Sequence, residues 1–356
     1  MQPHILILGA GITGAALAYR LTQGGARVTV LEAGTPAAAA SGGSFGWVNA
    51  SFFLSDAHFH LRHAAMAAHD ALARELGLNP QPQGCLWYEA AGAEFDRQHA
   101  SLARLGYPFE LLERQEIAAR EPRLANPPAR ALRFPTERAV DLVALTTGLL
   151  AAATAGGARL ITGLGALALI EEAGRVTGVQ TAQGAIVADH TILATGTGTP
   201  ALLAPLGLTF PMLRRPGAVL HSQPLQRLLS HILATPEIEV RQDATGRLIA
   251  PAAAHHQADT AEDLAHPEDL ISATLARLQA LFPKADIRAD RLIMAARPVP
   301  GDGLPAIGAV RPGLSMAVMH SGATLAPHVA ELLAAEVLGQ GESPALTAFR
   351  PTRFFA

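Results

Sequence analysis

Three glycines and an acidic residue near the start of the chain have the spacing of a nucleotide-binding site. Gly9, Gly11 and Gly14 form a G-x-G-x-x-G motif that follows the apolar run Ile5 to Leu8. A helical pattern comes next, and a second apolar run ends at Glu32. Glycine at these places permits a tight turn, close approach of the backbone to a pyrophosphate, and close packing of the helix on the strand, while the acid can accept hydrogen bonds from a ribose. The stretch predicts a dinucleotide site and leaves NAD and FAD open.

The residues beside the motif are expected to belong to the same site. The helix that begins after the glycines would present backbone amide groups, and the positive end of its dipole, to the phosphates. Ile12 and Thr13 lie in that first turn, and Ala33 follows the acidic residue. We therefore expect all three to contact the cofactor.

A glycine-rich loop with aromatic side chains, SGGSFGWVNASF, occupies residues 41–52. Such a loop can run along a pyrophosphate and a ribityl chain and bring an aromatic side chain to a ring system. We expect residues 41–44, among them Ser41, Gly42 and Ser44, to follow the phosphates, and residues 46–49, among them Trp47, to lie near the ring. The alternative is that Trp47 is a core residue, since large aromatic side chains are usually buried for packing.

Composition narrows the classes of function. The chain has 356 residues, of which 49% are apolar, and a formal charge of −3, which predicts no affinity for nucleic acid or anionic membrane. We expect no transmembrane segment and no signal peptide, because no apolar run reaches about 18 residues and the N-terminus lacks a basic leader with a cleavage site. Cys85 is the only cysteine, which excludes an intrachain disulfide and favours the cytoplasm.

Two stretches nearer the C-terminus carry a resemblance to a known family. They are ADHTILATGTGTPALLAPLGL at 188–208 and ARPVPGDGLPAIGAVRPGLSMAVMHSGATLAPHVAELLAAEVLG at 296–339. Together with the N-terminal motif and its loop, they resemble the FAD-dependent oxidoreductases of the D-amino acid oxidase, glycine oxidase and sarcosine oxidase family. The resemblance is strong at both ends of the chain and weak in residues 56–140 and 213–290. It implies FAD as the cofactor.

The resemblance also implies further contacts to FAD. Thr195 and Gly196 end the strand of the ATG element, and a backbone position near Leu167 is expected to face the adenine. The last helix is expected to open at the sequence LAP, with Pro327 in its first turn, where a missing N–H costs nothing. That helix would aim amide groups at the pyrimidine edge of the flavin, where negative charge develops on reduction. The contacts expected there come from Gly322, Ala323, Thr324 and Leu325.

The same resemblance places two candidate catalytic residues. Arg297 stands where the family has an arginine that binds the substrate carboxylate, and a planar guanidinium suits that task; the alternative is a salt bridge between domains. His320 would lie close to the flavin and accept the amine proton or bond a carbonyl. His320 and Ser321 replace an Arg–Asn pair of glycine oxidases, which weakens the case for a glycine-like substrate. Cys85 lies far from the C-terminal cysteine that carries covalent flavin in some relatives, so non-covalent FAD is implied.

Two groups of histidines suggest a metal site at first sight. His58, His60 and His63 begin an expected helix, and His255 and His256 lie in an expected loop. Neither group comes with carboxylates or cysteines at ligand spacing. We therefore predict no metal site and interpret these histidines as solvated or helix-capping residues.

The predicted fold is α/β, with a Rossmann-like FAD domain of the glutathione reductase type and a second, α+β substrate domain built on an antiparallel sheet. The FAD domain is assigned to residues 1–54, 142–211 and 296–356, and the substrate domain to 55–141 and 212–295. An amphipathic helix is expected at 265–283, and a crossover helix within 135–158 re-enters the first domain.

The leading hypothesis is an oxidoreductase that oxidises the C–N bond of an amino acid or N-substituted amino acid by hydride transfer to FAD. The electron acceptor would be oxygen or a partner redox protein. One alternative is the FAD-carrying subunit of a multi-subunit amino acid or opine-type dehydrogenase. Another is a non-catalytic FAD-binding protein. The expected small-molecule partner is an amine or amino acid.

Overall fold

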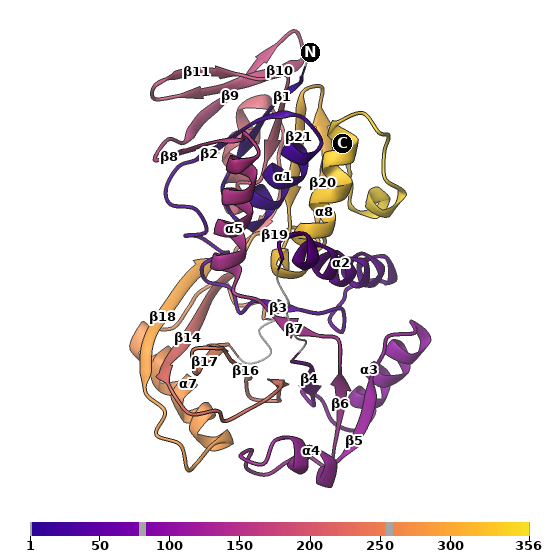
Figure 1. The fold of residues 1–356 in the computed structure, drawn as a ribbon, viewed down its shortest axis with the longest axis vertical. Coiled ribbons are helices and arrows are strands. Elements are labelled where there is room, and N and C mark those ends of the chain that lie inside the picture. The colour runs from indigo at the N-terminus through magenta and orange to yellow at the C-terminus, as the bar shows by residue number, and fades with distance from the viewer. Residues whose placement is uncertain (1, 78–82, 254–258, 356) are drawn as a thin grey trace.

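The computed structural model describes residues 2–77, 83–253 and 259–355, and the upper half of the molecule in Figure 1 is built on a six-stranded sheet. The outermost strand β20 is antiparallel to its neighbour, and all the other neighbouring strands are parallel. Across the sheet the strands are β20 (Ala306–Arg311), β21 (Leu314–Val318), β12 (His190–Leu193), β1 (His4–Leu8), β2 (Arg27–Glu32) and β8 (Arg159–Thr162).

Three helices pack together beside this sheet. They are α1 (Ile12–Gln23), α5 (Leu142–Ala155) and α8 (Gly322–Val337), and α1 contacts both of the others. Helix α5 begins where it does because the Asp141 carboxylate accepts a hydrogen bond from the Ala144 amide at 2.9 Å, which satisfies one free N–H of the first turn. A small antiparallel sheet of β9 (Ala166–Glu172), β10 (Arg175–Thr181) and β11 (Gly184–Val187) lies at the top of Figure 1.

The N-terminal β-α-β unit confirms the sequence prediction. The apolar run Ile5 to Leu8 lies in β1, whose five residues are all buried, and Glu32 is the last residue of β2. Parallel strands with helices packed beside them bury both faces, which explains why β1 reads as an uninterrupted apolar run.

The start of the last helix differs from the prediction. Helix α8 begins at Gly322, so Pro327 lies within the helix and not in its first turn. A proline there has no N–H to give to the carbonyl of Ala323, four residues earlier. Nε2 of His69 lies 2.8 Å from that carbonyl oxygen and bonds it instead. The helix therefore tolerates Pro327 because a side chain from another helix replaces the missing donor.

The lower half of the molecule in Figure 1 contains an eight-stranded sheet. Its neighbouring strands are antiparallel except for the parallel pair β15–β4, so the predicted antiparallel sheet has one parallel pairing. These two strands come from distant parts of the chain, so no hairpin forces them to run in opposite directions. In order, the strands are β18 (Ala289–Ala296), β14 (Pro216–Pro224), β17 (Arg247–Pro251), β16 (Glu239–Gln242), β15 (Ile232–Ala234), β4 (Cys85–Trp87), β6 (Arg130–Phe134) and β5 (Glu110–Glu113).

Helices accompany this sheet as well. Helix α7 (Pro267–Leu281) contacts β14 and β18 and falls inside the predicted amphipathic stretch. Helix α4 (Arg114–Arg120) contacts β5 and β6, and α3 (Gly92–Arg104) precedes β5 in the chain. Cys85, in β4, is fully buried, as expected of a core thiol.

Three elements join the two halves. Helix α2 (Asp56–Glu75) packs on α8 of the upper half, although residues 55–141 were assigned to the substrate domain. The strand pairs β3 (Trp47–Val48) with β7 (Arg138–Ala139), and β13 (Met212–Leu213) with β19 (Val299–Pro300), are each antiparallel. The proposed domain boundaries stay a prediction.

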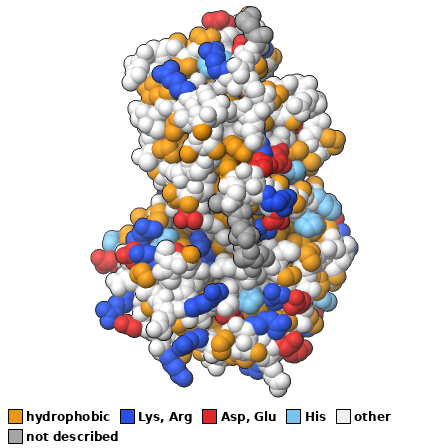
Figure 2. All heavy atoms as spheres, viewed as in Figure 1, with side chains coloured by type: hydrophobic (Ala, Val, Ile, Leu, Met, Phe, Trp, Pro, Cys, Tyr) orange, Lys and Arg blue, Asp and Glu red, His pale blue; other side chains and the backbone are white. Residues whose placement is uncertain are grey.

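Charged side chains are unevenly visible on the face shown in Figure 2, with more of them over the lower half than over the upper half. Among the residues that the model describes, no helix is long and apolar enough to cross a membrane.

Candidate active site

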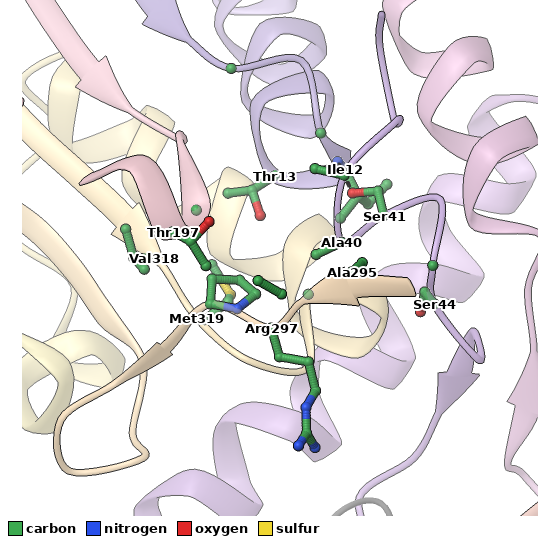
Figure 3. Close-up of a pocket in the computed structure, with 18 of the residues that line it drawn as sticks. Ile12, Thr13, Ala40, Ser41, Ser44, Thr197, Ala295, Arg297, Val318 and Met319 are labelled. Carbon is green, nitrogen blue, oxygen red and sulfur yellow. Dashed lines mark hydrogen bonds between the residues drawn. The ribbon is translucent and has the colours of Figure 1, made fainter. Parts of the chain in front are cut away.

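A cavity of about 540 Å³ opens at the carboxyl ends of β1, β2 and β12. Strands β2 and β12 lie on opposite sides of β1, so the chain order reverses there, which is where open α/β sheets bind ligands. The opposite wall comes from β14 and β18 of the second sheet, through Gly217, Ala218 and Ala295. Figure 3 shows Ile12, Thr13 and Ser41 along one edge of the cavity and Arg297 along the other.

Most of the predicted site residues lie on the wall of this cavity. Four do not, namely Gly14, Gly42, Thr324 and Leu325. Those that do are Gly9, Gly11, Ile12, Thr13, Glu32, Ala33, Ser41, Ser44, Trp47, Leu167, Thr195, Gly196, Arg297, His320, Gly322 and Ala323.

The glycine motif has the geometry that a phosphate cradle needs. Gly9 has φ +97°, a conformation that side-chain-bearing residues rarely adopt. A Cβ on Gly14 would lie 1.9 Å from the Gly9 carbonyl oxygen, so this glycine serves the packing of the helix against the loop. A Cβ on Gly11 would lie 3.1 Å from Oγ of Ser41, and that hydroxyl accepts a hydrogen bond from the Ile12 amide at 3.0 Å. The space beside Gly11 is therefore open only because glycine leaves it open.

The Glu32 carboxylate fixes the shape of the loop beside the cradle. Its two oxygens accept hydrogen bonds from the amides of Ala10 at 2.7 Å and Gly34 at 2.8 Å. Because Glu32 also lines the cavity, it remains placed for the ribose contact that its sequence position predicts.

Two of the four residues away from the cavity wall, Gly14 and Thr324, support the elements that form it. Thr324 is buried, and its Oγ1 accepts from the Asn49 amide at 3.3 Å and donates to the Trp47 carbonyl at 3.2 Å. It thereby ties the loop around Trp47 to the first turn of α8. Leu325 is a core residue, and Gly42 packs against the carbonyl of Ala37.

Trp47 is both a cavity residue and a core residue. Its ring is buried, and its indole N–H donates to the Glu137 carboxylate at 2.8 Å. The Tyr107 hydroxyl donates to the same carboxylate at 2.8 Å, and the Ser51 amide donates to it at 3.3 Å. Burial raises the pKa of Glu137 to about 7, against the opposing effect of these three donors. Trp47 is therefore buried, as the packing alternative expects, and it also lines the cavity, while its contact with a ring system stays a prediction.

Arg297 also combines two roles. It lines the cavity, and its Nη2 lies 2.9 Å from an Asp259 carboxylate oxygen, with both side chains about 15% exposed or less. Its Nε donates to the Arg215 carbonyl at 3.3 Å. Burial lowers the pKa of Arg297, and the carboxylate of Asp259 opposes that shift. The guanidinium is thus held in a fixed orientation by partners from the segment just before β14 and from the chain before α7.

His320 lies on the cavity wall at the start of α8. Its Nδ1 is 3.2 Å from Oγ of Ser321, which has the left-handed φ of 55°. That backbone bend turns the chain from β21 into the helix and leaves the imidazole beside Gly322 and Met319.

The histidines considered for a metal site differ in their exposure. His60 and His63 are exposed, as expected, whereas His58 is buried and its Nδ1 accepts from the Leu54 amide at 3.3 Å. His255 and His256 lie outside the described residues. Within the described ranges, no group of three or more His, Cys, Asp or Glu side chains could hold a metal ion.

Sequence reasoning missed several residues of the cavity wall. Arg62 of α2 is the most notable, because it is a fully buried cation. It falls on the apolar face of its helix, three residues after Phe59 and four before Met66, and this misfit of an arginine in an apolar pattern was the available signal. The others include Phe45, Gly217, Ala218, Val219, Pro251, Asp259, Ala295 and Pro298.

These residues fit a dinucleotide that carries a flat ring system. A side chain at position 11 would fill the space beside the loop. The glycine there keeps this space free, as close approach of a pyrophosphate to the backbone requires. Leu167, at the rim, leaves 66% of its surface exposed, which suits a flat apolar ligand lying over it. The small residues of the opposite wall leave room for a second molecule.

Comparisons with known proteins agree with this geometry. Residues 4–336 match the family model described as FAD dependent oxidoreductase. A D-amino acid dehydrogenase from Cereibacter sphaeroides is 42% identical over 110 residues, which are 30% of this chain and 25% of that one. The bifunctional protein ThiO/ThiG of Trichormus variabilis is 30% identical over 99% of this chain and 55% of its own length. The chain therefore spans about half or less of these curated relatives.

One solved structure is similar over its whole length. The crystal structure of glycine oxidase from Geobacillus kaustophilus superposes with a TM-score of 0.87 and 25% sequence identity, covering 99% of both chains. The likeness includes both halves of the molecule, and therefore both walls of the cavity.

Proposed function

Because the chain belongs to the family of FAD-dependent oxidoreductases, we propose that it binds FAD without a covalent bond and oxidises the C–N bond of an amino acid or N-substituted amino acid. The observation that carries this proposal is one cavity with two chemically different walls. The first wall is the glycine cradle, and the second carries the half-buried guanidinium of Arg297. A dinucleotide and a small carboxylate can therefore meet in one enclosed space.

FAD and the protein would have separate roles in the reaction. FAD supplies a ring that accepts a hydride, and Gly9, Gly11 and the first turn of α1 would hold its pyrophosphate. The N-terminus of α8 borders the cavity through Gly322 and Ala323. The positive end of its dipole would stabilise negative charge on the edge of the flavin ring that lies there.

Arg297 would bind and orient the substrate carboxylate. A guanidinium gives two parallel hydrogen bonds to a carboxylate, which fixes both position and angle. The bond from Nε to the Arg215 carbonyl already sets the plane of the group. Asp259 now accepts from Nη2, so a substrate carboxylate would have to share or displace that contact.

His320 would accept a proton from the substrate amine. Amine oxidation needs the nitrogen lone pair free when hydride leaves the neighbouring carbon, so a proton must go to a nearby base. A neutral imidazole can accept it. A purely structural role as a hydrogen-bond donor is the alternative, and a pH profile of His320→Gln against the unmodified protein separates the two.

The electron acceptor is either oxygen or a partner redox protein. The dehydrogenase named among the relatives supports a partner, and the glycine oxidase structure supports oxygen. A non-catalytic FAD-binding role is the further alternative. The single cysteine supports our proposal of a cytoplasmic location.

An anaerobic screen tests the proposed function. The yellow protein is mixed with D- and L-amino acids, N-methyl amino acids and simple amines, and loss of flavin colour is measured. We expect bleaching by at least one amino acid, and acid should release the flavin as FAD. Peroxide formed on re-aeration indicates an oxidase, and dye reduction with little peroxide indicates a dehydrogenase. Colour that no compound bleaches contradicts the enzymatic proposal.

A further inference from the structure

A buried cation on the cavity wall has no part in the function proposed above. Arg62 of α2 is 1% exposed and lines the same cavity as the glycine cradle and Arg297. Nothing in the resemblance singled it out. A buried charge is costly unless it is paired and hydrogen-bonded, so its presence needs a physical reason.

The hydrogen bonds of Arg62 account for only part of its guanidinium. Nε donates to the backbone carbonyl of Asn49 at 3.1 Å, and Nη2 donates to the side-chain oxygen of the same residue. The cation also lies over the Phe52 ring, with Cζ 5.9 Å from the ring centroid. Nη1 is buried and has no hydrogen-bond partner among the residues of the described ranges. Two oxygens of Asn49 thus bind Nε and Nη2 of the guanidinium, and Nη1 has no acceptor among the described residues.

No carboxylate neutralises this cation directly. Over residues 2–77, 83–253 and 259–355, Arg62 forms no ion pair within 4 Å. Glu137 acts on it from a longer range, but that carboxylate is already bonded to Trp47, Tyr107 and Ser51. Burial lowers the pKa of Arg62 to about 10, so the group is still positive at neutral pH. The negative charge that would balance Arg62 can therefore come from an anion in the cavity that this residue lines.

The position of Arg62 indicates which ligand group that is. Asn49, which holds the guanidinium, donates its amide to Thr324 in the first turn of α8. Arg62 is thereby fixed to the end of the cavity where the positive end of α8 enters it. Arg297 instead lies on the second sheet, where a Cβ on Gly217 would be 3.6 Å from its side chain. The two arginines serve different ends of the cavity.

We propose that Arg62, from its place on the cavity wall, supplies the counter-charge for the reduced, anionic flavin at the pyrimidine edge of the FAD ring. This inference rests on the proposed binding of FAD. It makes Arg62 a cofactor residue that acts together with the dipole of α8. A substrate carboxylate offers similar acceptor chemistry and is the competing partner that the experiment must separate.

The test uses sulfite, which adds to the flavin ring and leaves it with the same negative charge as reduction does, with no substrate present. Arg62→Met and Arg62→Gln remove the charge, and Arg62→Lys keeps it. Loss of a positive charge from a water-poor site near the anionic ring weakens its stabilisation, so the sulfite Kd of both neutral variants should rise about tenfold or more. A tenfold change corresponds to about 30 mV for a two-electron couple, which a dye-equilibrium measurement of the flavin potential should reproduce. Arg62→Lys should recover most of the affinity.

Arg20→Met is the matched control. Arg20 is a largely buried arginine of α1 that pairs with Glu75 and Glu331 and does not line the cavity. The same loss of charge there should leave sulfite affinity unchanged. A second arm measures the binding of a carboxylate inhibitor, such as acetate or benzoate, by its effect on the flavin spectrum.

Each outcome decides the inference. Wild-type sulfite affinity in the neutral variants overturns it. Weakened carboxylate binding with unchanged sulfite affinity also overturns it, and assigns Arg62 to the substrate. Aggregation of both neutral variants, with FAD present, shows that the charge serves folding and overturns it as well. A wild-type protein that binds no FAD refutes the proposed function itself, which is a separate result.

Discussion

The two ends of the cavity are formed by different kinds of chemical group. The cradle end consists of backbone and small residues, in which Gly9, Gly11 and Ser41 come from two adjacent segments. The opposite end depends on charged side chains, in which Arg297 and Asp259 come from different elements and meet only in the fold. The first end tolerates almost no added atoms, and the second depends on which charges face one another. The difference suggests that the cradle decides whether the cofactor binds, and the charged end decides which substrate is accepted.

Substitution of Gly11 by valine should break the cradle end most completely. The first carbon of the new side chain would lie 3.1 Å from Oγ of Ser41, and the two methyl groups would enter the pyrophosphate space. Overfilling a packed site costs about 1–3 kcal/mol even before cofactor contacts are lost, so FAD affinity should fall about 100-fold or more. The purified variant should be colourless and folded by circular dichroism.

Gly148→Ala is the control for this change, since a Cβ there meets nothing within 4 Å and the residue lies inside α5. It should retain full FAD content. A yellow Gly11→Val protein would mean that the cofactor does not approach this glycine.

Arg297 tests the charged end of the cavity. Losing one partner of a desolvated charge pair costs about 2–5 kcal/mol, so Arg297→Ala should lower kcat/KM for a carboxylate substrate by roughly 30-fold to several thousandfold. Arg297→Lys should remain impaired, because it keeps the charge and loses the fork. Both variants should retain FAD.

The matching amine without a carboxylate sharpens the result for Arg297. The loss should shrink on that substrate, whereas an equal loss on both substrates would assign a structural role. Arg288→Ala, at an exposed arginine of the same region, should change neither value.

Glu137 bonds Trp47 of the cavity wall, and its effect should appear in the pH dependence of stability. Its pKa rises from 4.5 to about 7 on folding, so the native state holds a proton that the unfolded state releases. The free energy of unfolding should therefore decrease as pH rises from about 4.5 to about 7, by about 3 kcal/mol from this group. Glu137→Gln should flatten that part of the profile in urea titrations. An unchanged slope would show that the carboxyl group titrates normally.

Asp259→Asn is expected to have the smallest effect. Removing this carboxylate frees Arg297 from a competitor for the substrate, so carboxylate inhibitors should bind a few-fold more tightly, corresponding to about 1 kcal/mol or less for a partly exposed pair. Spectroscopic titration with acetate measures the change. Weaker inhibitor binding would instead show that Asp259 orients Arg297 for its ligand.

The contrast between the two ends also explains what the sequence could predict. The strand, glycine turn, helix and acid of the cradle lie within residues 4–32, so local spacing carried their geometry, and the structure confirmed it. The burial of Trp47 agrees with its interpretation as a core residue, and its contact with the ring stays a prediction. By contrast, Arg62 looks like an ordinary charged helix residue, and only its position among the apolar residues of α2 indicates that it is buried. Asp259 lies in residues 213–290, where the resemblance is weak.

The start of α8 shows a different limit of sequence reasoning. Proline near a helix start normally marks the first turn, and here the helix begins five residues earlier. The compensation by His69 involves a residue more than 250 positions away in the chain. No local pattern contains that information.

The bond between His69 and the Ala323 carbonyl has an evolutionary consequence. Burial lowers the pKa of His69 to about 4, so the imidazole stays neutral and bonds the proline-freed carbonyl at physiological pH. A lineage that lost His69 while keeping Pro327 would leave a buried carbonyl unpaired at the mouth of the cofactor site. A lineage that first replaced Pro327 by an ordinary helix former would regain the N–H and make the histidine dispensable. The two positions should therefore change in a preferred order, with the proline before the histidine.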